Sequence, residues 1–375
     1  MTRKVCLVGP AYPYRGGIAH FTSQLAREFR KDHDLFVVNF QRQYPSLLFP
    51  GKTQYDKSGV PLDLESERLI DSINPLSFPK AARAINEYRP DLVVFQWWHP
   101  FFAFAYRTIS GRIRKRSDAK VVFLCHNVLP HESSVVDRVL IRHAFGAVDR
   151  FLVQSREDEE NLKRIKPGTV SRVHPHPIYD CFNTGQSSKE TARSELGVKG
   201  KVLLFFGYIR AYKGLGVLLT AFAETLRDGP ATLLVVGEFY EKRDGYDAMI
   251  EELGIAEHVR IVDEYVPNEA VEKYFKACDV VVLPYLSATQ SGIVQVAYGF
   301  DKPVIVTEVG GLPDVVDHGE TGFVVPPRDS GALAAAIREF FNDGSPDRFE
   351  GRIVAAKSRF SWARCKELLI ELGGA

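Results

Sequence analysis

The stretch Val202–Phe222, VLLFFGYIRAYKGLGVLLTAF, decides the fold class. Its apolar run Val202–Phe206 has the length and residue types of a buried strand, and an amphipathic segment of helical length begins near Lys213. The same order of strand and then helix recurs before and after this stretch. Such a repeat predicts an α/β protein in which right-handed crossovers join the strands into parallel sheets.

One tract interrupts the repeat. Between His174 and Ser188 the chain is rich in proline, glycine and small polar residues, which indicates a linker. We therefore predict two Rossmann-like, doubly wound domains that face a cleft, residues 1–180 and residues 181–355. Ligands of such sheets bind beyond the carboxyl ends of the strands, so functional residues are expected in the loops that follow strands.

Composition excludes several classes of protein. A chain of 375 residues exceeds one hydrophobic core, and 48 basic against 47 acidic residues give no overall charge that would favour nucleic acid as a partner. The apolar run at the start is too short for a signal peptide, and no apolar run is long enough to span a membrane. Five scattered cysteines without a CxxC pair indicate reduced thiols in a cytoplasmic protein.

Two loops of the first domain contain candidate binding residues. Gly16 and Gly17 follow the first strand and precede a helix, so the backbone can approach a phosphate or a substrate there, although a tight turn has the same pattern. His126 and Asn127 follow the apolar run that ends at Leu124. A histidine there can hydrogen-bond a ligand or transfer a proton, and a helix cap or a core histidine is the alternative.

An aromatic segment follows another strand. Trp97, Trp98 and His99 come at the end of the strand that begins at Leu92, and their rings suit a sugar or lipid acceptor, although core packing is an equally good explanation. The basic cluster Arg112–Arg116 lies downstream of an apolar segment. That pairing can rest on an anionic membrane surface, or it can be a solvated helix end.

The second domain has the sharper signal. Gly207 ends the strand of the opening stretch, and Arg210 and Lys213 then place two cations at the start of a helix. Positive side chains there oppose the helix dipole, and a bound diphosphate would resolve the conflict. Further on, Gln290, Ser291 and Gly292 precede another predicted helix and can form an anion site from backbone N–H groups.

Taken together, these segments resemble the group 1 class of nucleotide-sugar glycosyltransferases, which have the GT-B fold. The resemblance covers nearly the whole chain. It rests on Gly16–Gly17, on the pattern Gly207-x-x-Arg210-x-x-Lys213-Gly214, on Val235–Glu238 (VVGE), on Ala277–Pro284 (ACDVVVLP), on Lys302–Pro303 with Gly310–Gly311, and on Arg359–Trp362 (RFSW).

The resemblance implies transfer of a sugar from a nucleotide diphosphate sugar to a glycan or lipid-linked acceptor, with retention of configuration and without a cofactor or metal. The setting would be cell-surface polysaccharide or glycoconjugate synthesis, in the cytoplasm or peripherally at the inner face of the cell membrane. The sugar donor would bind the second domain and the acceptor the first, and the helix within residues 356–375 would cross back to the first domain.

Individual roles follow from the same resemblance. The residues that match sugar-donor contacts are Gly16, Gly17, Gly207, Arg210, Lys213, Glu238, Tyr265, Val266, Gln290, Ser291, Gly292 and Gln295. Arg210 and Lys213 match the pair that neutralises the diphosphate, and His126 matches a histidine near the transferred sugar, so these three are the catalytic candidates. The acceptor candidates are Trp97, Trp98, His99 and Asn127.

The sequence departs from the family at one point. Two glutamates separated by seven residues are usual there, but alignment back from Lys302–Pro303 puts Ala288 and Val296 in their places, and Val280–Phe300 contains no charged residue. Gln290, Ser291 and Gln295 can offer hydrogen bonds but no negative charge. Two alternatives therefore stay open: a degenerate module that binds nucleotide or glycan, and a sugar epimerase or phosphorylase on the same architecture.

Overall fold

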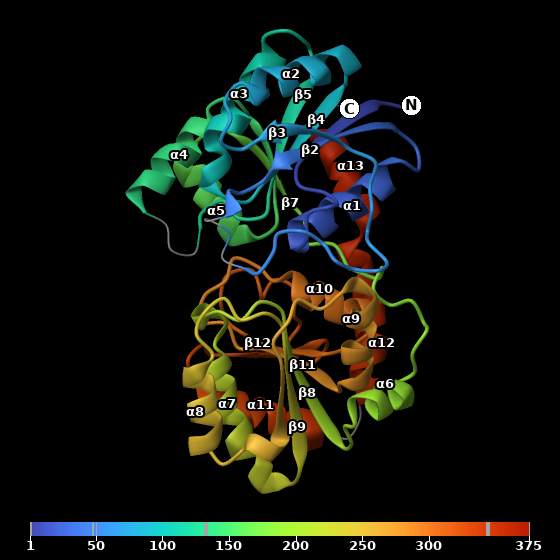
Figure 1. Ribbon diagram of the computed structural model, residues 1–375, viewed down its shortest axis with the longest axis vertical. Coiled ribbons are helices and arrows are strands. Elements are labelled where there is room, and N and C mark those ends of the chain that lie inside the picture. The colour runs from blue at the N-terminus through green and yellow to red at the C-terminus, as the bar shows by residue number, and fades with distance from the viewer. Residues whose placement is uncertain (1, 47–48, 50, 131–133, 343–345, 375) are drawn as a thin grey trace. The chain divides into compact units, whose positions relative to one another are not determined.

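The computed structural model describes residues 2–46, 49, 51–130, 134–342 and 346–374 (Figure 1). The chain forms two compact units, and each is described by itself. The first unit comprises residues 1–57, 61–175 and 361–375, and the second comprises residues 58–60 and 176–360.

The first unit is built on a parallel sheet with the strand order β3-β2-β1-β4-β5-β6-β7. The strands are β1 (Lys4–Val8), β2 (Asp34–Arg42), β3 (Glu67–Asp71), β4 (Leu92–Trp97), β5 (Lys120–Cys125), β6 (Arg150–Val153) and β7 (Val170–Val173). Its helices are α1 (Gly17–Phe29), α2 (Ser77–Tyr88), α3 (Ala103–Arg114), α4 (Val135–Phe145), α5 (Arg156–Ile165) and α13 (Trp362–Leu372). Both faces of the sheet are covered, which explains why its central strands are continuously apolar.

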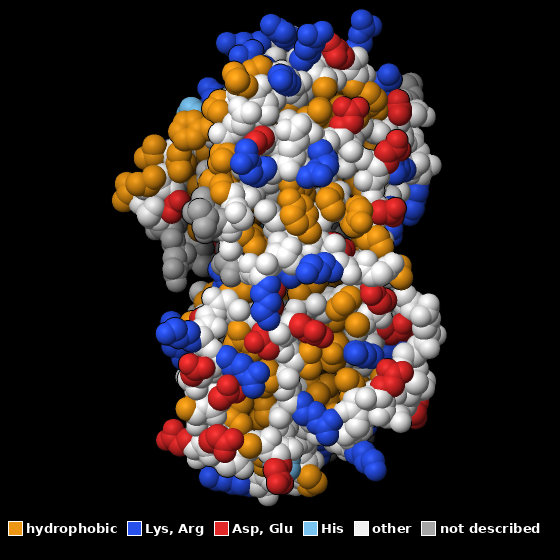
Figure 2. Space-filling view, viewed as in Figure 1, with side chains coloured by type: hydrophobic (Ala, Val, Ile, Leu, Met, Phe, Trp, Pro, Cys, Tyr) orange, Lys and Arg blue, Asp and Glu red, His pale blue; other side chains and the backbone are white. Residues whose placement is uncertain are grey.

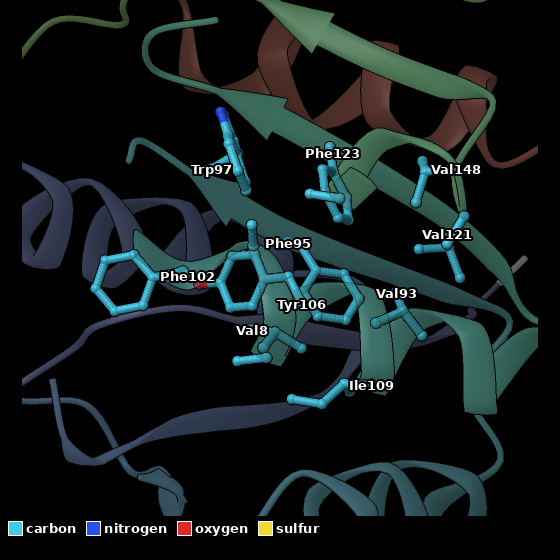
Figure 3. Packing of buried hydrophobic residues seen from close by; sticks show 14 of the residues in the cluster. Val8, Val93, Phe95, Trp97, Phe102, Tyr106, Ile109, Val121, Phe123 and Val148 are labelled. Carbon is cyan, nitrogen blue, oxygen red and sulfur yellow. The ribbon is translucent and has the colours of Figure 1, made fainter. Parts of the chain in front are cut away.

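Aromatic side chains dominate the core on one face of this sheet (Figure 3). The rings of Phe95 on β4 and Phe123 on β5 lie 5.2 Å apart, and Tyr106 on α3 packs 5.1 Å from Phe95. The opposite face packs against α1 and the last helix α13, with the ring of Trp362 at 4.8 Å from that of Phe21. The C-terminal helix thus belongs to the first unit.

The second unit repeats the plan with the strand order β10-β9-β8-β11-β12-β13, again parallel. The strands are β8 (Lys201–Phe206), β9 (Ala231–Val236), β10 (Val259–Val262), β11 (Val280–Leu283), β12 (Val304–Thr307) and β13 (Gly322–Val325). The helices are α6 (Lys189–Leu196), α7 (Leu215–Thr225), α8 (Asp244–Glu252), α9 (Asn268–Ala277), α10 (Gly292–Gly299), α11 (Ser330–Asn342) and α12 (Pro346–Ala356). The predicted pair of parallel α/β sheets is confirmed.

The unit boundaries differ from the predicted 180/181 and 355/356 by five residues, for local reasons. The N–H of Ile178 donates to the carbonyl of Phe360 at 3.1 Å, and Arg359 pairs with Asp317 at 2.5 Å, so both segments belong to the second unit. Residues 58–60 join that unit because Ser58 Oγ accepts the N–H of Asn268 at 3.0 Å. A short segment inside the first domain's sequence therefore packs on α9, which the sequence pattern did not predict.

Two further observations bear on the setting of the protein. Among the residues that the structure describes, no helix is long and apolar enough to cross a membrane. All five cysteines are free thiols, and four of them are buried.

Candidate functional site

Arg210 and Lys213 lie in the loop that leaves the central strand β8. A single 3-10 turn, Ala211–Lys213, precedes α7, so the helix begins two residues later than predicted. Lys213 is only 8% exposed, and burial lowers the pKa of its amine. Within the described part of the chain its Nζ makes no hydrogen bond or ion pair and lies 5.3 Å from the ring centroid of Tyr285. A buried cation without an anionic partner is uncommon, which marks this loop as an anion site.

Glycines make room for the two cations. Gly207 has φ +105, and a Cβ added there would lie 3.2 Å from Lys213 Nζ. Gly214 has φ +71, and its added Cβ would lie 2.0 Å from the carbonyl oxygen of Pro284 in the loop after β11. Any other residue at these positions would be strained and would displace the lysine or the neighbouring loop.

The loop after β9 supports this turn. The guanidinium carbon of Arg210 lies 4.9 Å from the ring centroid of Tyr240, and the Glu241 carboxylate accepts the N–H of Ala211 at 2.9 Å. Tyr246 in turn donates its hydroxyl to Glu241 at 2.5 Å. These contacts fix the direction in which Arg210 points. Sequence reasoning missed Tyr240, Glu241 and Tyr246, because nothing in the local pattern links them to a loop thirty residues earlier.

The loop after β11 forms the other side of this edge of the sheet. Ser291 caps α10 by accepting the N–H of Ile293 at 3.3 Å, and the Tyr285 hydroxyl lies 3.2 Å from Ser291 Oγ. The loop after β12 holds it in place, because Gly311 donates its N–H to the carbonyl of Thr289 at 2.8 Å. The segment Gln290–Gly292 is thus tied to the same strand ends as Lys213.

Gln295, a predicted contact of the sugar donor, lies on α10 and is buried. Its side chain is 1% exposed, and its buried Oε1 accepts no hydrogen bond from the described residues. An unsatisfied buried acceptor costs free energy that a ligand hydroxyl could recover. Ala288 and Val296, the positions aligned with the family's glutamates, are both buried, and no residue between Asp279 and Asp301 is charged.

Three other predicted contacts lie beside the strand ends of the second unit. Glu238 is 2% exposed, and its backbone carbonyl accepts the N–H of Ile209 at 3.0 Å. The ring of Tyr265 lies 6.1 Å from that of Tyr208, and the ring of Tyr208 lies 4.4 Å from that of Tyr240 in a tilted arrangement. Val266 is buried. The loops after β8, β9 and β10 therefore share an aromatic cluster next to Arg210.

In the first unit, His126 lies where β1, β4 and β5 end. Its Nε2 is 2.7 Å from the Gln96 Oε1 acceptor, and its ring packs edge-on against Phe21 at 4.6 Å. Gly9 allows this arrangement, because a Cβ there would lie 2.6 Å from Gln96 Cγ. Gln96 was not assigned a role from the sequence, although a polar residue in a fully buried strand was a usable signal.

A residue of α5 contacts the loop that follows His126. Asp158, which caps this helix with Ser155, also accepts the N–H of Val128 at 2.8 Å. Burial raises the pKa of this carboxyl to about 6. Sequence reasoning missed Asp158, since its capping position indicates nothing about the loop that it contacts.

The glycine pair follows β1 as predicted. Gly16 has φ +99 at the N-cap of α1, and a Cβ on Gly17 would meet nothing within 4 Å. The backbone at the start of α1 therefore leaves room for a close approach. The first unit brings together Gly16, Gly17 and His126 at one edge of its sheet, and the second unit brings together the loops of Lys213 and Ser291.

The acceptor prediction needs one correction. Trp97 is 1% exposed and packs against Phe145 at 5.1 Å within the core shown in Figure 3, because it is the last residue of β4 and faces α3 and α4. Its ring therefore belongs to the aromatic core of the first unit. Trp98 is partly exposed and donates its Nε1–H to the Tyr44 hydroxyl at 2.9 Å, His99 is exposed and caps a short 3-10 turn, and Asn127 is partly exposed.

No group of three or more His, Cys, Asp or Glu side chains that could hold a metal ion occurs among the described residues.

Comparisons with known proteins agree with this arrangement. Residues 200–343 match the profile of the family described as glycosyl transferases group 1, and residues 15–178 match that of glycosyltransferase family 4. D-inositol 3-phosphate glycosyltransferase of Corynebacterium diphtheriae is 30% identical over 257 residues, which are 65% of this chain and 60% of that protein. The protein of the same name from Streptomyces avermitilis is 32% identical over 232 residues, 58% of this chain and 50% of that protein.

The match thus spans 50 to 60% of the length of these curated relatives. Among solved structures, sucrose-phosphate synthase from Thermosynechococcus elongatus superposes with a TM-score of 0.74 at 18% identity, covering 99% of this chain and 98% of that one. The Anabaena protein Alr3699/HepE in complex with UDP-glucose gives 0.74 at 19% identity, with 98% of both chains covered. These likenesses establish the GT-B fold.

Proposed function

We propose that this chain, which belongs to the group 1 glycosyltransferases, transfers a sugar from a nucleoside diphosphate sugar to a hydroxyl group of a glycan or lipid-linked acceptor. The bond between the anomeric carbon and the diphosphate oxygen breaks, a bond to the acceptor oxygen forms, and the acceptor loses its proton. The observation that carries the proposal is Lys213, a buried cation without an anionic partner in the described chain.

The diphosphate would bind between the two cations and the start of α10. Arg210 offers a planar pair of donors and Lys213 a compact charge, and both become more favourable as negative charge develops on the leaving diphosphate. The N–H groups at the start of α10 would supply further donors. Gly16 and Gly17, in the first unit, stay predicted contacts of the sugar donor. The base would lie by Tyr265 and Val266, Gln295 would approach the ribose, and Glu238 would be a further contact of the sugar donor.

The remaining roles are also part of the proposal. His126, with the proton on Nε2 held by Gln96, would contact the transferred sugar, and Trp98, His99 and Asn127 would contact the acceptor. Transfer with retention of configuration, without a metal, in the cytoplasmic synthesis of surface polysaccharide or glycoconjugate is also part of the proposal, because the resemblance to the family implies it. Two solved structures with the same fold hold UDP or UDP-glucose, which supports a nucleotide sugar as the substrate.

A panel of sugar nucleotides tests the proposal. We expect one of the uridine, guanosine, thymidine or adenosine diphosphosugars to raise the melting temperature, because a ligand that binds only the folded state stabilises it. The same compound should be consumed when an acceptor is present, in EDTA as well as in its absence, and inositol phosphate is included among the acceptors because the curated relatives are named for it. Binding without any turnover would favour the degenerate module, and a changed sugar on the same nucleotide would favour an epimerase.

Gln295 gives a second prediction within the proposal. We expect Gln295→Leu to leave the free protein as stable or more stable, because an unsatisfied buried acceptor is removed, while affinity for the nucleotide falls about fivefold through the loss of a hydrogen bond of ~1 kcal/mol. Thermal unfolding and titration with the nucleoside diphosphate measure the two effects. Gln24→Leu is the matched control, since Gln24 also buries an unsatisfied amide atom but lies in the first unit. Unchanged affinity in Gln295→Leu would remove this residue from the binding site.

A further inference from the structure

The segment that opens the second unit lies along α10. We call residues 176–183 the linker segment. The N–H of Tyr179 donates to the backbone carbonyl of Gln295 at 3.3 Å, and Asn183 Nδ2 donates to the carbonyl of Gly299 at 3.0 Å. A Cβ added to Gly299 would lie 2.3 Å from the carbonyl oxygen of Tyr179. The linker segment and the end of α10 are therefore in close backbone contact, which a residue with a side chain at the last position of the helix would prevent.

His176 has a restricted backbone, because it lies between Pro175 and Pro177. Proline fixes its own φ and favours an extended conformation in the residue before it. The side chain of His176 is buried, and its Nδ1 lies 3.0 Å from the carbonyl oxygen of Pro177. Since a carbonyl oxygen only accepts hydrogen bonds, Nδ1 carries the proton, and Nε2 of the neutral ring is an acceptor.

Tyr179 completes a buried polar pair. Its hydroxyl lies 3.3 Å from His176 Nε2 and donates to it, and the two rings lie 5.0 Å apart. Burial raises the pKa of the Tyr179 phenol, so the hydroxyl keeps the proton that this hydrogen bond needs. Groups of the protein thus engage both nitrogens of the His176 ring and select one tautomer. We call His176 and Tyr179 the linker pair.

The linker pair lies against the first turn of α10. A Cβ added to Gly292, the first residue of the helix, would lie 3.6 Å from the imidazole Nε2 of the pair and 3.8 Å from its tyrosine ring. The next residue, Ile293, contacts the loop after β8. A Cβ added to Gly207 would lie 3.6 Å from Ile293 Cδ1 and 3.2 Å from Lys213 Nζ. The first turn of α10 therefore has the linker pair on one side and the loop of Lys213 on another.

The second unit shows no broad charge that would attract an anion on the face drawn in Figure 2. Lys, Arg, Asp and Glu side chains are mixed over this face, without a large area of one sign. Attraction for a diphosphate is therefore local, and in the proposed function it comes from Arg210, Lys213 and the N–H groups at the start of α10. Hydrogen bonds weaken steeply with distance and angle, so the position of the first turn decides how well these groups act together.

We propose that the linker pair consists of positioning residues for the sugar donor. The pair holds the first turn of α10 at the place where its N–H groups and Lys213 reach the same diphosphate. This inference rests on the proposed function and adds to it two residues that act through α10 without touching the ligand. An apolar pair could fill the same space, but directed hydrogen bonds in a satisfied buried network also fix the position of the turn. Loss of a hydrogen bond inside the linker segment should therefore weaken binding at α10.

Tyr179→Phe tests the inference in the whole chain, because it removes one hydroxyl and leaves the ring. We expect the affinity for the nucleoside diphosphate that binds the unchanged protein to fall about fivefold, as for the loss of one hydrogen bond. His176→Phe keeps a ring but removes both hydrogen bonds, so affinity should fall about tenfold or more. His176→Gln can still accept the tyrosine hydroxyl with its amide oxygen and should recover part of that loss. Calorimetric titration measures affinity, and chemical denaturation measures the free energy of unfolding.

Tyr298→Phe is the matched control near the other end of α10. Tyr298 is also buried, and its hydroxyl lies 3.1 Å from the carbonyl oxygen of Val315 and 2.8 Å from Thr321 Oγ1. Removal of this hydroxyl should lower the free energy of unfolding at least as much as Tyr179→Phe does, while affinity for the nucleoside diphosphate stays unchanged. If the linker pair served only to pack α10, affinity would follow stability in both variants.

The tautomer of His176 gives a spectroscopic readout. In nitrogen NMR of protein with isotope-labelled histidine, the His176 resonances are identified by their loss in His176→Phe. They should show a protonated Nδ1 and an unprotonated Nε2, and they should shift when the nucleoside diphosphate is added. The opposite tautomer, no shift on binding, or equal changes of affinity in Tyr179→Phe and Tyr298→Phe would overturn this inference and leave the proposed function standing. If the unchanged protein bound no nucleoside diphosphate, the proposed function would fail and this inference with it.

Discussion

Lys213→Met is expected to lower kcat/KM for the nucleotide sugar by two to three orders of magnitude, while the free protein becomes no less stable. Loss of one preorganised charge at a developing anion typically costs about 10²–10³ in rate. Methionine keeps the length of the buried stem and can occupy the space beside the Tyr285 ring. The activity loss would therefore not come from a cavity.

The stability half of this prediction follows from the burial of the amine. Burial lowers the pKa of Lys213, which means that the folded protein without ligand disfavours the charged form. Replacing the lysine by a neutral side chain removes that cost at any pH at which the amine is protonated. Lys213 destabilises the free enzyme, so its substitution should lower activity while the stability of the folded protein stays equal or rises.

A pH dependence follows with a defined sign. The diphosphate binds the protonated amine, so affinity for the nucleoside diphosphate should fall as pH rises through the lowered pKa of Lys213, below the usual range for lysine. Titration with the nucleoside diphosphate at several pH values measures the affinity, steady-state kinetics measure kcat/KM, and thermal unfolding measures the stability.

The control is Lys199→Met, which removes an exposed cation away from the loop and for which no change is expected. Full activity in Lys213→Met would refute the assignment of the phosphate site.

Much of the fold follows from local pattern. Each apolar run that was assigned to a strand ends near a glycine or a polar loop, and the parallel sheet follows because a helical segment separates each strand from the next. The linker between the domains was also readable, since His174 to Ser188 lacks apolar periodicity. The assignment of residues 58–60 to the second unit could not be predicted from the sequence. These residues contact Asn268, which is 210 residues away in the sequence, and only tertiary packing brings the two segments together.

The site was predictable in part. Arg210 and Lys213 could be found because two cations at a helix start conflict with the helix dipole, and the structure leaves both without an anionic partner among the described residues. Trp97 lies in the core because β4 continues to this residue and both faces of the sheet are covered, whereas the apolar run in the sequence ends at Phe95. Glu241 could not be predicted as a residue of the site. It contacts the loop after β8, and only the pairing of β8 with β9 brings the two loops together.

Gly237→Ala is expected to destabilise the second unit by about 3 kcal/mol or more and to abolish binding of the sugar donor. Gly237 ends β9 with φ +147, a conformation that strains any residue with a side chain, and its added Cβ would lie 2.1 Å from the carbonyl oxygen of Gly207. The backbone of both residues is held by hydrogen bonds, since the N–H of Gly207 donates to Val236 and that of Gly237 donates to Val262, so the collision cannot be relieved by rotating a side chain.

The displacement caused by this contact should also change the candidate site, because Gly207 begins the loop that contains Arg210 and Lys213. Relief of the contact requires β8 or β9 to move at its carboxyl end, and the contacts of Tyr240 and Glu241 with that loop would then be lost. Chemical denaturation measures the stability change, and titration with the nucleoside diphosphate at low temperature, where the variant remains folded, measures binding.

Gly245→Ala is the matched control and should shift stability in the opposite direction. Gly245 lies in α8 with nothing within 4 Å of an added Cβ, so alanine should stabilise the helix by up to ~1 kcal/mol and leave binding unchanged. Together with Lys213→Met, the two glycine variants separate the charge of the site from its shape: the lysine variant loses rate but keeps stability, and Gly237→Ala loses both. If Gly237→Ala retained normal binding, the strand ends would not be what positions the cations.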